Sequence, residues 1–306
     1  MAARTTLVTG ATGLVGRRLT ASLRRDDRSV RVVSRNTAAS GFGDDVEALA
    51  WNGRSLAAEV LFRVGDLVHL AGEPIFGGRL TAKRRRRIRA SRIDSTRSIV
   101  EALGALPEAD RPACFVCASA VGYYGSRGDE RLAEDATAGA GFLAQVCADW
   151  EAAALAATEL GIRTVCLRIG IVLAREGGAL PRLALPFRLG LGGRVGDGSQ
   201  WFPWIHNEDL VAIVRAALDD ERHRGAVNAV APVPVTNAEF THTLGRVLHR
   251  PTLVPVPAFA VRVALGELSD EVLGSRRVVP QALEERGFSF AHREIESALL
   301  AELDAN

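Results

Sequence analysis

The chain has 306 residues, of which 47% are apolar, so it can bury a full hydrophobic core without help from disulfides or metal ions. Its 38 basic and 36 acidic residues nearly cancel, which argues against nucleic acid, a membrane surface or a polyanion as the main partner. We therefore expect a small-molecule site.

No apolar run approaches the ~20 residues that span a bilayer, and the N-terminus lacks the pattern of a secretion signal. These features predict a cytoplasmic protein without a membrane partner. Four cysteines, Cys114, Cys117, Cys147 and Cys166, are interpreted as reduced core residues. Cys114 and Cys117 have the spacing of a redox or zinc pair, but no second pair accompanies them, so no metal is expected.

The first half of the chain alternates short apolar runs with helical patterns. Strands are expected at Thr5–Thr9, Val30–Ser34, 46–51, 67–71, 113–119 and Arg163–Ile169. Helices are expected directly after the first strand, at 81–103 and at 142–159. This alternation is typical of a doubly wound parallel sheet, so we predict an α/β fold of the Rossmann type with a smaller C-terminal substrate lobe.

Beyond residue 170 the chain becomes rich in glycine, which favours loops of the kind that carry substrate sites. Residues 201–210 are expected to return the chain to the sheet, and 227–230 to form a last strand. We predict a nucleotide-binding domain at 1–231, with 171–205 as a substrate-side insertion, and a C-terminal substrate lobe at 232–306.

A glycine-rich turn joins the first strand to the first helix, which is the context of a dinucleotide-binding fingerprint. Gly10 permits the tight turn, Gly13 lets backbone N–H groups approach a pyrophosphate, and Gly16 allows the helix to pack closely. The turn residues predicted to bind the cofactor are Gly10, Thr12, Gly13, Leu14, Val15 and Gly16.

The end of the second strand predicts which dinucleotide binds. Proteins that bind NAD usually have an acid there, on the ribose hydroxyl, whereas this chain has Ser34 and Arg35. A guanidinium can hold a phosphate by two parallel hydrogen bonds, and no carboxylate repels it, so NADP(H) is predicted. The alternative is that Arg35 is only a solvated surface residue.

Arg92 stands out on the predicted helix 81–103, because Ile88 and Thr96, four residues to either side, face the sheet. A buried arginine needs an anionic partner, and either a cofactor phosphate or Glu73 could supply it. Glu73 is also a candidate acid. The basic run 83–87 is expected to be a solvated helix face rather than a surface for nucleic acid.

Several ordered motifs carry a family resemblance: the glycine turn, then residues 70–75, 91–92, 119–125, 168–170 and 201–206. Together they resemble the epimerase-like atypical short-chain dehydrogenase/reductases, nearly end to end, since 255–300 also resembles the C-terminal domain of that subgroup. The resemblance implies an extended Rossmann domain that binds NADP(H). It places Ser34 and Arg35 at the adenosine phosphate, and it implies further cofactor contacts at Leu70, Ala71, Gly72, Glu73, Arg92 and Val172.

The resemblance also exposes a departure in the catalytic residues. In well-understood relatives the acid/base is a tyrosine whose pKa is lowered by a lysine four residues later, with a serine orienting the substrate oxygen. The only lysine here is Lys83, and no tyrosine precedes it by four residues. By alignment Leu143 and Cys147 occupy the two positions, so the usual pair is absent.

Three residues are the predicted catalytic groups that remain. Ser119 matches the serine of the family pattern, and Tyr123 or Tyr124 could replace the missing acid; alternatively both tyrosines pack as anchors of their loop. His206 with Asp209 is a further candidate general base; the alternative is a structural hydrogen bond to the backbone.

Two functions remain open from the sequence. The first is an NADP(H)-dependent oxidoreductase or nucleotide-sugar-epimerase-like enzyme acting on a small hydroxyl- or carbonyl-bearing substrate. The second is a non-catalytic NADPH-binding protein with a redox-sensing or regulatory role, as the missing pair would suggest. Either function predicts one dinucleotide per chain.

Overall fold

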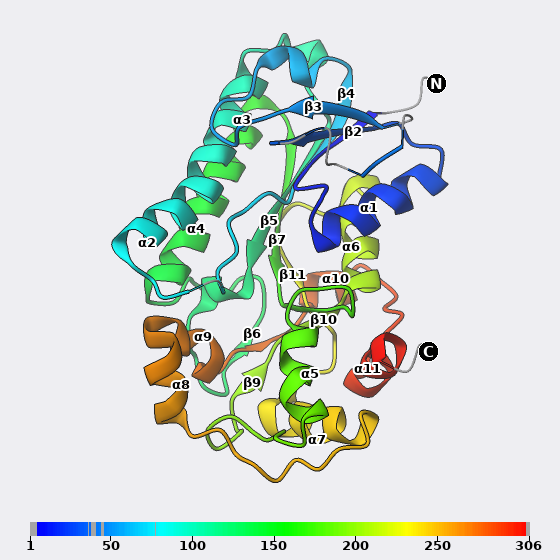
Figure 1. The fold of residues 1–306 in the computed structure, drawn as a ribbon. Helices are drawn as coiled ribbons and strands as arrows, with labels where there is room; N and C mark the ends of the chain where they lie inside the picture. The colour runs from blue at the N-terminus through cyan, green and yellow to red at the C-terminus, as the bar shows by residue number, and fades with distance from the viewer. Residues whose placement is uncertain (1–4, 36, 38–40, 44–45, 77, 304–306) are drawn as a thin grey trace.

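A parallel sheet forms the centre of the molecule. The structure, a computed structural model, describes residues 5–303 except 36, 38–40, 44–45 and 77. Within that part of the chain, seven parallel strands pair in the order β11-β7-β5-β4-β1-β2-β3 (Figure 1). The strands are β1 (Thr5–Thr9), β2 (Val30–Ser34), β3 (Glu47–Ala50), β4 (Val64–His69), β5 (Cys114–Ala120), β7 (Arg163–Ile169) and β11 (Gly225–Ala229). The predicted Rossmann-type sheet is confirmed.

Helices cover both faces of the sheet. On one face lie α1 (Leu14–Arg25) and α6 (Asn207–Asp219), and on the other lie α3 (Ser95–Gly104) and α4 (Phe142–Leu155). Leu19 and Leu23 of α1 are fully buried, as their spacing of four residues predicts. Burial of a leucine contributes about 1.5–3 kcal/mol, so this apolar stripe fixes the helix against β1 and β2.

The helix predicted at 81–103 is interrupted. It consists of α2 (Ala82–Arg89), a π-helical turn at Ala90–Asp94, and α3. A π-turn widens the backbone by one residue and occurs often at functional sites. Arg92 lies on this turn, so its direction could not be read from a regular helical period.

Two strand predictions need correction. The fourth strand ends at His69, so Leu70 and Ala71 lie just beyond it rather than inside it. Residues 201–210 do not rejoin the main sheet: β10 (Trp204–His206) pairs with β8 (Ile171–Leu173) in a separate two-stranded sheet. The prediction failed because a short apolar run does not reveal its partner strand.

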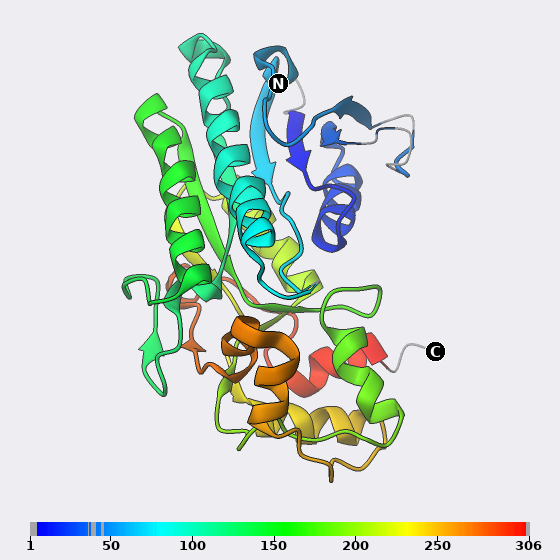
Figure 2. The same ribbon diagram turned by 60° about the vertical axis from the view of Figure 1, so that its left-hand side comes forward.

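The C-terminal part of the chain forms a second core beyond the strand ends (Figure 2). The helices that line this core are α5 (Leu180–Arg188), α7 (Asn237–Val247) and α11 (Ile295–Leu303). Helix α8 (Ala258–Leu265) packs toward α4 with α9 (Ser269–Leu273) beside it, and α10 (Gln281–Glu285) packs against β11. Short strand pairs accompany them, β9 (Trp201–Phe202) with β12 (Val235–Thr236) and β6 (Arg131–Leu132) with β13 (Arg277–Val278). None of the helices in the described residues has the length and apolar character that crossing a bilayer requires.

Candidate functional site

The glycine turn lies where the order of the strands reverses, between β1 and β4. Ligands of open α/β sheets bind at such a point, outside the carboxyl ends of the strands. Gly10 has a φ of +69°, and a Cβ atom built on it would lie 2.7 Å from the backbone nitrogen of Ala71. A Cβ on Gly16 would lie 2.3 Å from the carbonyl oxygen of Gly10. Backbone packing therefore requires glycine at both positions.

The start of α1 offers free backbone donors. Gly13 is the N-cap residue, and no side chain caps the helix there. The first N–H groups of a helix lack partners inside it and carry partial positive charge, so this end suits an anionic group. The loop after β8 closes over it, because a Cβ on Gly178 would lie 3.0 Å from Leu14 Cδ2 and 3.5 Å from the carbonyl oxygen of Val172. Val15 is partly buried in the same turn, and Thr12 is exposed.

The residues expected at the adenosine end lie one strand away. Ser34 is the last residue of β2, which pairs with β1 so that Val33 is opposite Thr9. Arg35 follows directly and is exposed to solvent. Both residues therefore lie at the same edge of the sheet as the glycine turn, with Arg35 exposed to solvent there.

Arg92 faces the loop after β4. Its Nη1 atom donates to the carbonyl oxygen of Glu73 over 3.0 Å, and its guanidinium carbon lies 5.2 Å from the ring centre of Trp150. The carboxylate of Glu73 pairs with Arg87 instead. A Cβ built on Gly72 would lie 3.5 Å from the Arg92 guanidinium, so the guanidinium packs directly against the backbone of the loop after β4. Burial lowers the pKa of Arg92, as expected for a cation that lacks a full counter-charge.

His69 is a residue of this region that sequence reasoning missed. It is fully buried at the end of β4, where Nδ1 lies 2.6 Å from Thr9 Oγ1 and Nε2 lies 3.3 Å from Ser95 Oγ. Burial, and then the charge of Arg92, lower the pKa of His69 to about 3, so the imidazole is neutral. These contacts join β1, β4 and the start of α3. They stabilise the end of the sheet beneath the glycine turn.

Ser119 is the second-last residue of β5 and belongs to a buried charged network. Its Oγ donates to Glu151 Oε1 over 2.6 Å. Arg168 holds the same carboxylate with two bonds, Nε to Oε1 at 3.0 Å and Nη2 to Oε2 at 2.9 Å. Ser119 pairs with Arg168 of β7, and because His69 is opposite Cys117, it lies two residues beyond the end of β4.

The two tyrosines have different environments. Tyr124 is fully buried, and its hydroxyl lies 2.7 Å from Asn228 Oδ1 and accepts from Arg168 Nη1 at 2.9 Å. Burial raises the pKa of Tyr124 to about 12. Tyr123 is partly exposed, and its ring centre lies 3.5 Å from the guanidinium carbon of Arg168. Only Tyr123, of this pair, has a side chain that reaches solvent.

The positions of the absent catalytic pair hold no cation. Leu143 and Cys147 are both buried on α4, and burial raises the pKa of the Cys147 thiol to about 12. A Cβ on Gly122 would lie 3.8 Å from Cys147 Sγ and 3.7 Å from Glu271 Oε2. Glu271, from α9, is paired with Arg276 at 2.9 Å, and burial raises its pKa. The C-terminal part of the chain thus adds a carboxyl group beside this loop.

The sequence contains a signal for the buried network of Glu151 and Arg168 that our predictions did not include. Glu151 is the buried acid of an otherwise apolar helix face, and Arg168 is the one charged residue inside the apolar run of β7. Opposite charges in two buried elements predict an ion pair, because a single buried charge is costly. Glu271 gave no such signal, since it reaches the site from a distant segment.

His206 and Asp209 both hydrogen-bond to backbone N–H groups, which is the structural alternative considered from the sequence: His206 Nδ1 accepts from Glu208 at the start of α6. The two carboxylate oxygens of Asp209 accept the backbone N–H groups of Ala291, at 2.7 Å, and His292, at 3.0 Å. His206 also lies against the ring of His292, with ring centres 3.8 Å apart. Burial lowers the pKa of His206 to about 4.

Comparisons with known proteins agree with this fold. The sequence model of the NAD dependent epimerase/dehydratase family matches residues 6–229, and a domain of unknown function, DUF1731, matches residues 256–302. An epimerase family protein of Mycobacterium bovis is 42% identical over 303 residues, which cover 98% of this chain and 97% of the relative.

Two solved structures are similar over 99% of this chain. The human epimerase family protein SDR39U1, crystallised with NADPH, has a TM-score of 0.88 and 31% identity, and the match covers 100% of its chain. A nucleoside-diphosphate sugar epimerase from Corynebacterium glutamicum has a TM-score of 0.80 and 35% identity, and the match covers 58% of that longer chain.

Proposed function

The chain belongs to the NAD dependent epimerase/dehydratase family, and we propose that it binds NADPH and performs a redox step on a small hydroxyl- or carbonyl-bearing molecule. The observation that carries the proposal is the glycine turn at the β1/β4 edge, where side chains are excluded at Gly10 and Gly16. The NADPH in the structure of the human relative supports the choice of dinucleotide.

Each part of the dinucleotide has a proposed partner in this chain. The N–H groups at the start of α1 hold the pyrophosphate, and Ser34 and Arg35 bind the adenosine phosphate. Leu70, Ala71, Gly72 and Glu73 lie along the cofactor, with Arg92 and Val172 as further contacts. When bound, the nicotinamide exchanges a hydride with the substrate carbon.

Ser119 and Tyr123 are the proposed catalytic residues. The Ser119 hydroxyl donates to Glu151 in this structure; with a substrate bound it would donate instead to the substrate oxygen and polarise it, which leaves the hydroxyl hydrogen of the substrate for transfer to Tyr123. Tyr123 exchanges the proton with the substrate oxygen, and the Arg168 guanidinium against its ring stabilises negative charge that develops on the phenol. Arg168 thus supplies the positive charge that the missing lysine would have supplied.

Turnover measurements test whether the chain catalyses a redox reaction and whether Tyr123 takes part in it. NADPH oxidation, and NADP reduction, are followed with a panel of sugar nucleotides, ketones, aldehydes and alcohols. Tyr123→Phe is expected to lower kcat by about 10²–10⁴-fold while the affinity for NADPH stays unchanged, which is the usual contribution of a general acid. Arg224→Ala, an exposed substitution between α6 and β11, is the control. Turnover that is equal in Tyr123→Phe and wild type contradicts the assignment.

A second function is favoured by one observation, the buried Leu143 and Cys147 in place of the catalytic pair. In that case the chain is an NADPH-binding protein with a redox-sensing or regulatory role. It predicts tight binding without turnover over the whole panel. A variant with Ser119→Ala and Tyr123→Phe would then keep its cellular role, whereas loss of that role would favour the enzyme.

A further inference from the structure

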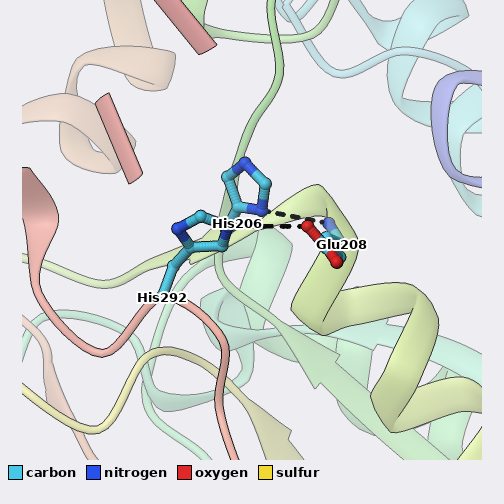
Figure 3. Close-up of side chains that lie close together, drawn as sticks. All are labelled: His206, Glu208 and His292. Carbon is cyan, nitrogen blue, oxygen red and sulfur yellow. Dashed lines mark hydrogen bonds and ion pairs between the residues drawn. The ribbon is translucent and has the colours of Figure 1, made fainter. Parts of the chain in front are cut away.

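Three side chains that bind metals meet at the start of α6, away from the glycine turn. His206 is the N-cap of α6, Glu208 lies in its first turn, and His292 comes from the loop before α11. The ligand atoms of these residues all lie within 4.8 Å of one another (Figure 3). The Nε2 atom of His292 lies 3.5 Å from Glu208 Oε2.

The two imidazoles have unused polar atoms. His206 is 3% exposed, and its Nδ1 accepts only a long bond of 3.2 Å from the backbone N–H of Glu208. Its Nε2 lies 2.9 Å from Glu302 Oε1, but the ring N–H is not directed at that oxygen, so no hydrogen bond forms. Among the described residues, Nδ1 of His292 is also buried without a partner, and its Nε2 faces Glu208. Buried polar atoms without partners are costly, so the hydrogen bonds of the described residues do not satisfy these two imidazoles.

We propose that His206, Glu208 and His292 form a binding site for a divalent transition-metal ion of the zinc type, with Glu302 as the carboxylate that orients His206. Two imidazoles and one carboxylate are the ligands of sites that keep a fourth position for water. His206 would bind through Nδ1, which faces Glu208 and His292. Its Nε2–H would then turn to Glu302, since metal-bound histidines usually donate their other N–H to a carboxylate.

The surrounding charge and structure suit a cation. Four carboxylates, those of Glu176, Glu208, Asp209 and Glu302, lie near the imidazoles, and the guanidinium of Arg18 bonds Glu176 at 2.7 Å and Glu302 at 3.4 Å. The exposed Glu208 carboxylate, which would be the anionic ligand, lies 3.5 Å from His292 Nε2. Glu208 is 67% exposed and lines a surface groove between α1 and α6, so an ion has a route from solvent.

The position of the site suggests what the metal would do. His206 and Glu208 lie in the segment matched by the epimerase family, and His292 lies in the segment matched by the domain of unknown function. The carboxylate of Asp209 already holds the backbone of His292 in place, so the ligands are pre-organised. A bound ion would join the C-terminal segment to the nucleotide-binding sheet.

Titration of chelator-treated full-length protein with Zn²⁺ tests the proposal, with Co²⁺ as a spectroscopic probe and Mg²⁺ as a hard ion that should not bind. We expect one Zn²⁺ per chain, a visible d–d band of four-coordinate Co²⁺, and a higher Tm with Zn²⁺. His292→Phe keeps the ring contact but removes the ligand nitrogen, and Glu208→Gln changes an exposed side chain. Each should weaken Zn²⁺ binding at least about 100-fold, and Glu302→Gln should weaken it about 10–100-fold.

His242→Ala is the matched control, because His242 is exposed on α7 and remote from the cluster in sequence. It should bind Zn²⁺ like wild type. Absence of Zn²⁺ binding in the wild-type protein overturns the proposal. So does Zn²⁺ binding of equal affinity in His292→Phe, Glu208→Gln and wild type, because the ion would then be held elsewhere.

Discussion

The two ends of the candidate site are built in different ways. At the β1/β4 edge, one contiguous turn, Gly10 to Gly16, sets the shape through its backbone. At the carboxyl ends of β5 and β7, side chains from three separate segments meet, namely Ser119 and Tyr124 from one, Glu151 from α4 and Arg168 from β7. A contiguous backbone motif can be recognised in the sequence, whereas a dispersed network becomes visible only in the fold. We therefore expect added side-chain volume to disturb the glycine turn, and removal of a charge to disturb the side-chain network around Glu151 and Arg168.

The largest effect is expected at the charged end. Arg168→Met removes the only guanidinium that bonds the buried Glu151 carboxylate among the described residues, and leaving one charge of a buried pair costs about 3–5 kcal/mol of stability. Urea unfolding measures it. In the double variant with Glu151→Leu, most of this loss should be recovered, because no uncompensated charge remains. A single variant as stable as wild type would show that the network does not hold this edge together.

A smaller loss of stability, together with a loss of binding, is expected at the glycine turn. In Gly16→Ala the new methyl group collides with the backbone of Gly10 and Ala11, which should cost about 1–3 kcal/mol and weaken NADPH binding by at least about tenfold. Gly104→Ala at the end of α3 is the control, since the nearest atom to its Cβ is 3.8 Å away. If Gly16→Ala binds NADPH with the affinity of wild type, close backbone packing at this position is not needed for cofactor binding.

The buried histidine beneath the glycine turn should make the stability of the protein depend on pH. The pKa of His69 is about 3 in the folded protein, against 6.5 for the free side chain. As the pH falls below about 6.5, the unfolded chain gains a proton that the folded chain cannot bind, so stability is lost. Between pH 6.5 and pH 5 this costs about 1.5 kcal/mol.

The variant His69→Gln tests this assignment. Its unfolding free energy should fall less steeply over the same pH range, whereas the exposed control His242→Gln should keep the wild-type slope. Equal slopes in His69→Gln and wild type would mean that His69 titrates alike in the folded and unfolded chains.

The sequence revealed the sheet and the cofactor turn because both rest on local patterns. The strands Thr5–Thr9, Val30–Ser34 and Arg163–Ile169 were predicted to the residue, since each is a short apolar run that turn-forming or helical residues flank. The π-turn at Arg92 could not be predicted, because one inserted residue leaves the apolar spacing almost unchanged.

The failures share one physical cause, which is contact between residues far apart in the chain. The pairing of β10 with β8, the approach of Glu271 to Gly122, and the meeting of His206 with His292 all depend on how the C-terminal helices pack. No local period or propensity encodes such a meeting. A sequence therefore predicts a site best where one segment builds it.

The most direct test of the account is a fluorescence titration of wild type and Arg35→Ala with NADPH and with NADH. We expect wild type to prefer NADPH. In Arg35→Ala, binding of NADPH should weaken about tenfold or more through loss of a charge-assisted phosphate contact, with NADH binding unchanged. Arg224→Ala, also an exposed arginine, should match wild type. Failure of wild type to bind either dinucleotide would show that the glycine turn is not a working cofactor site.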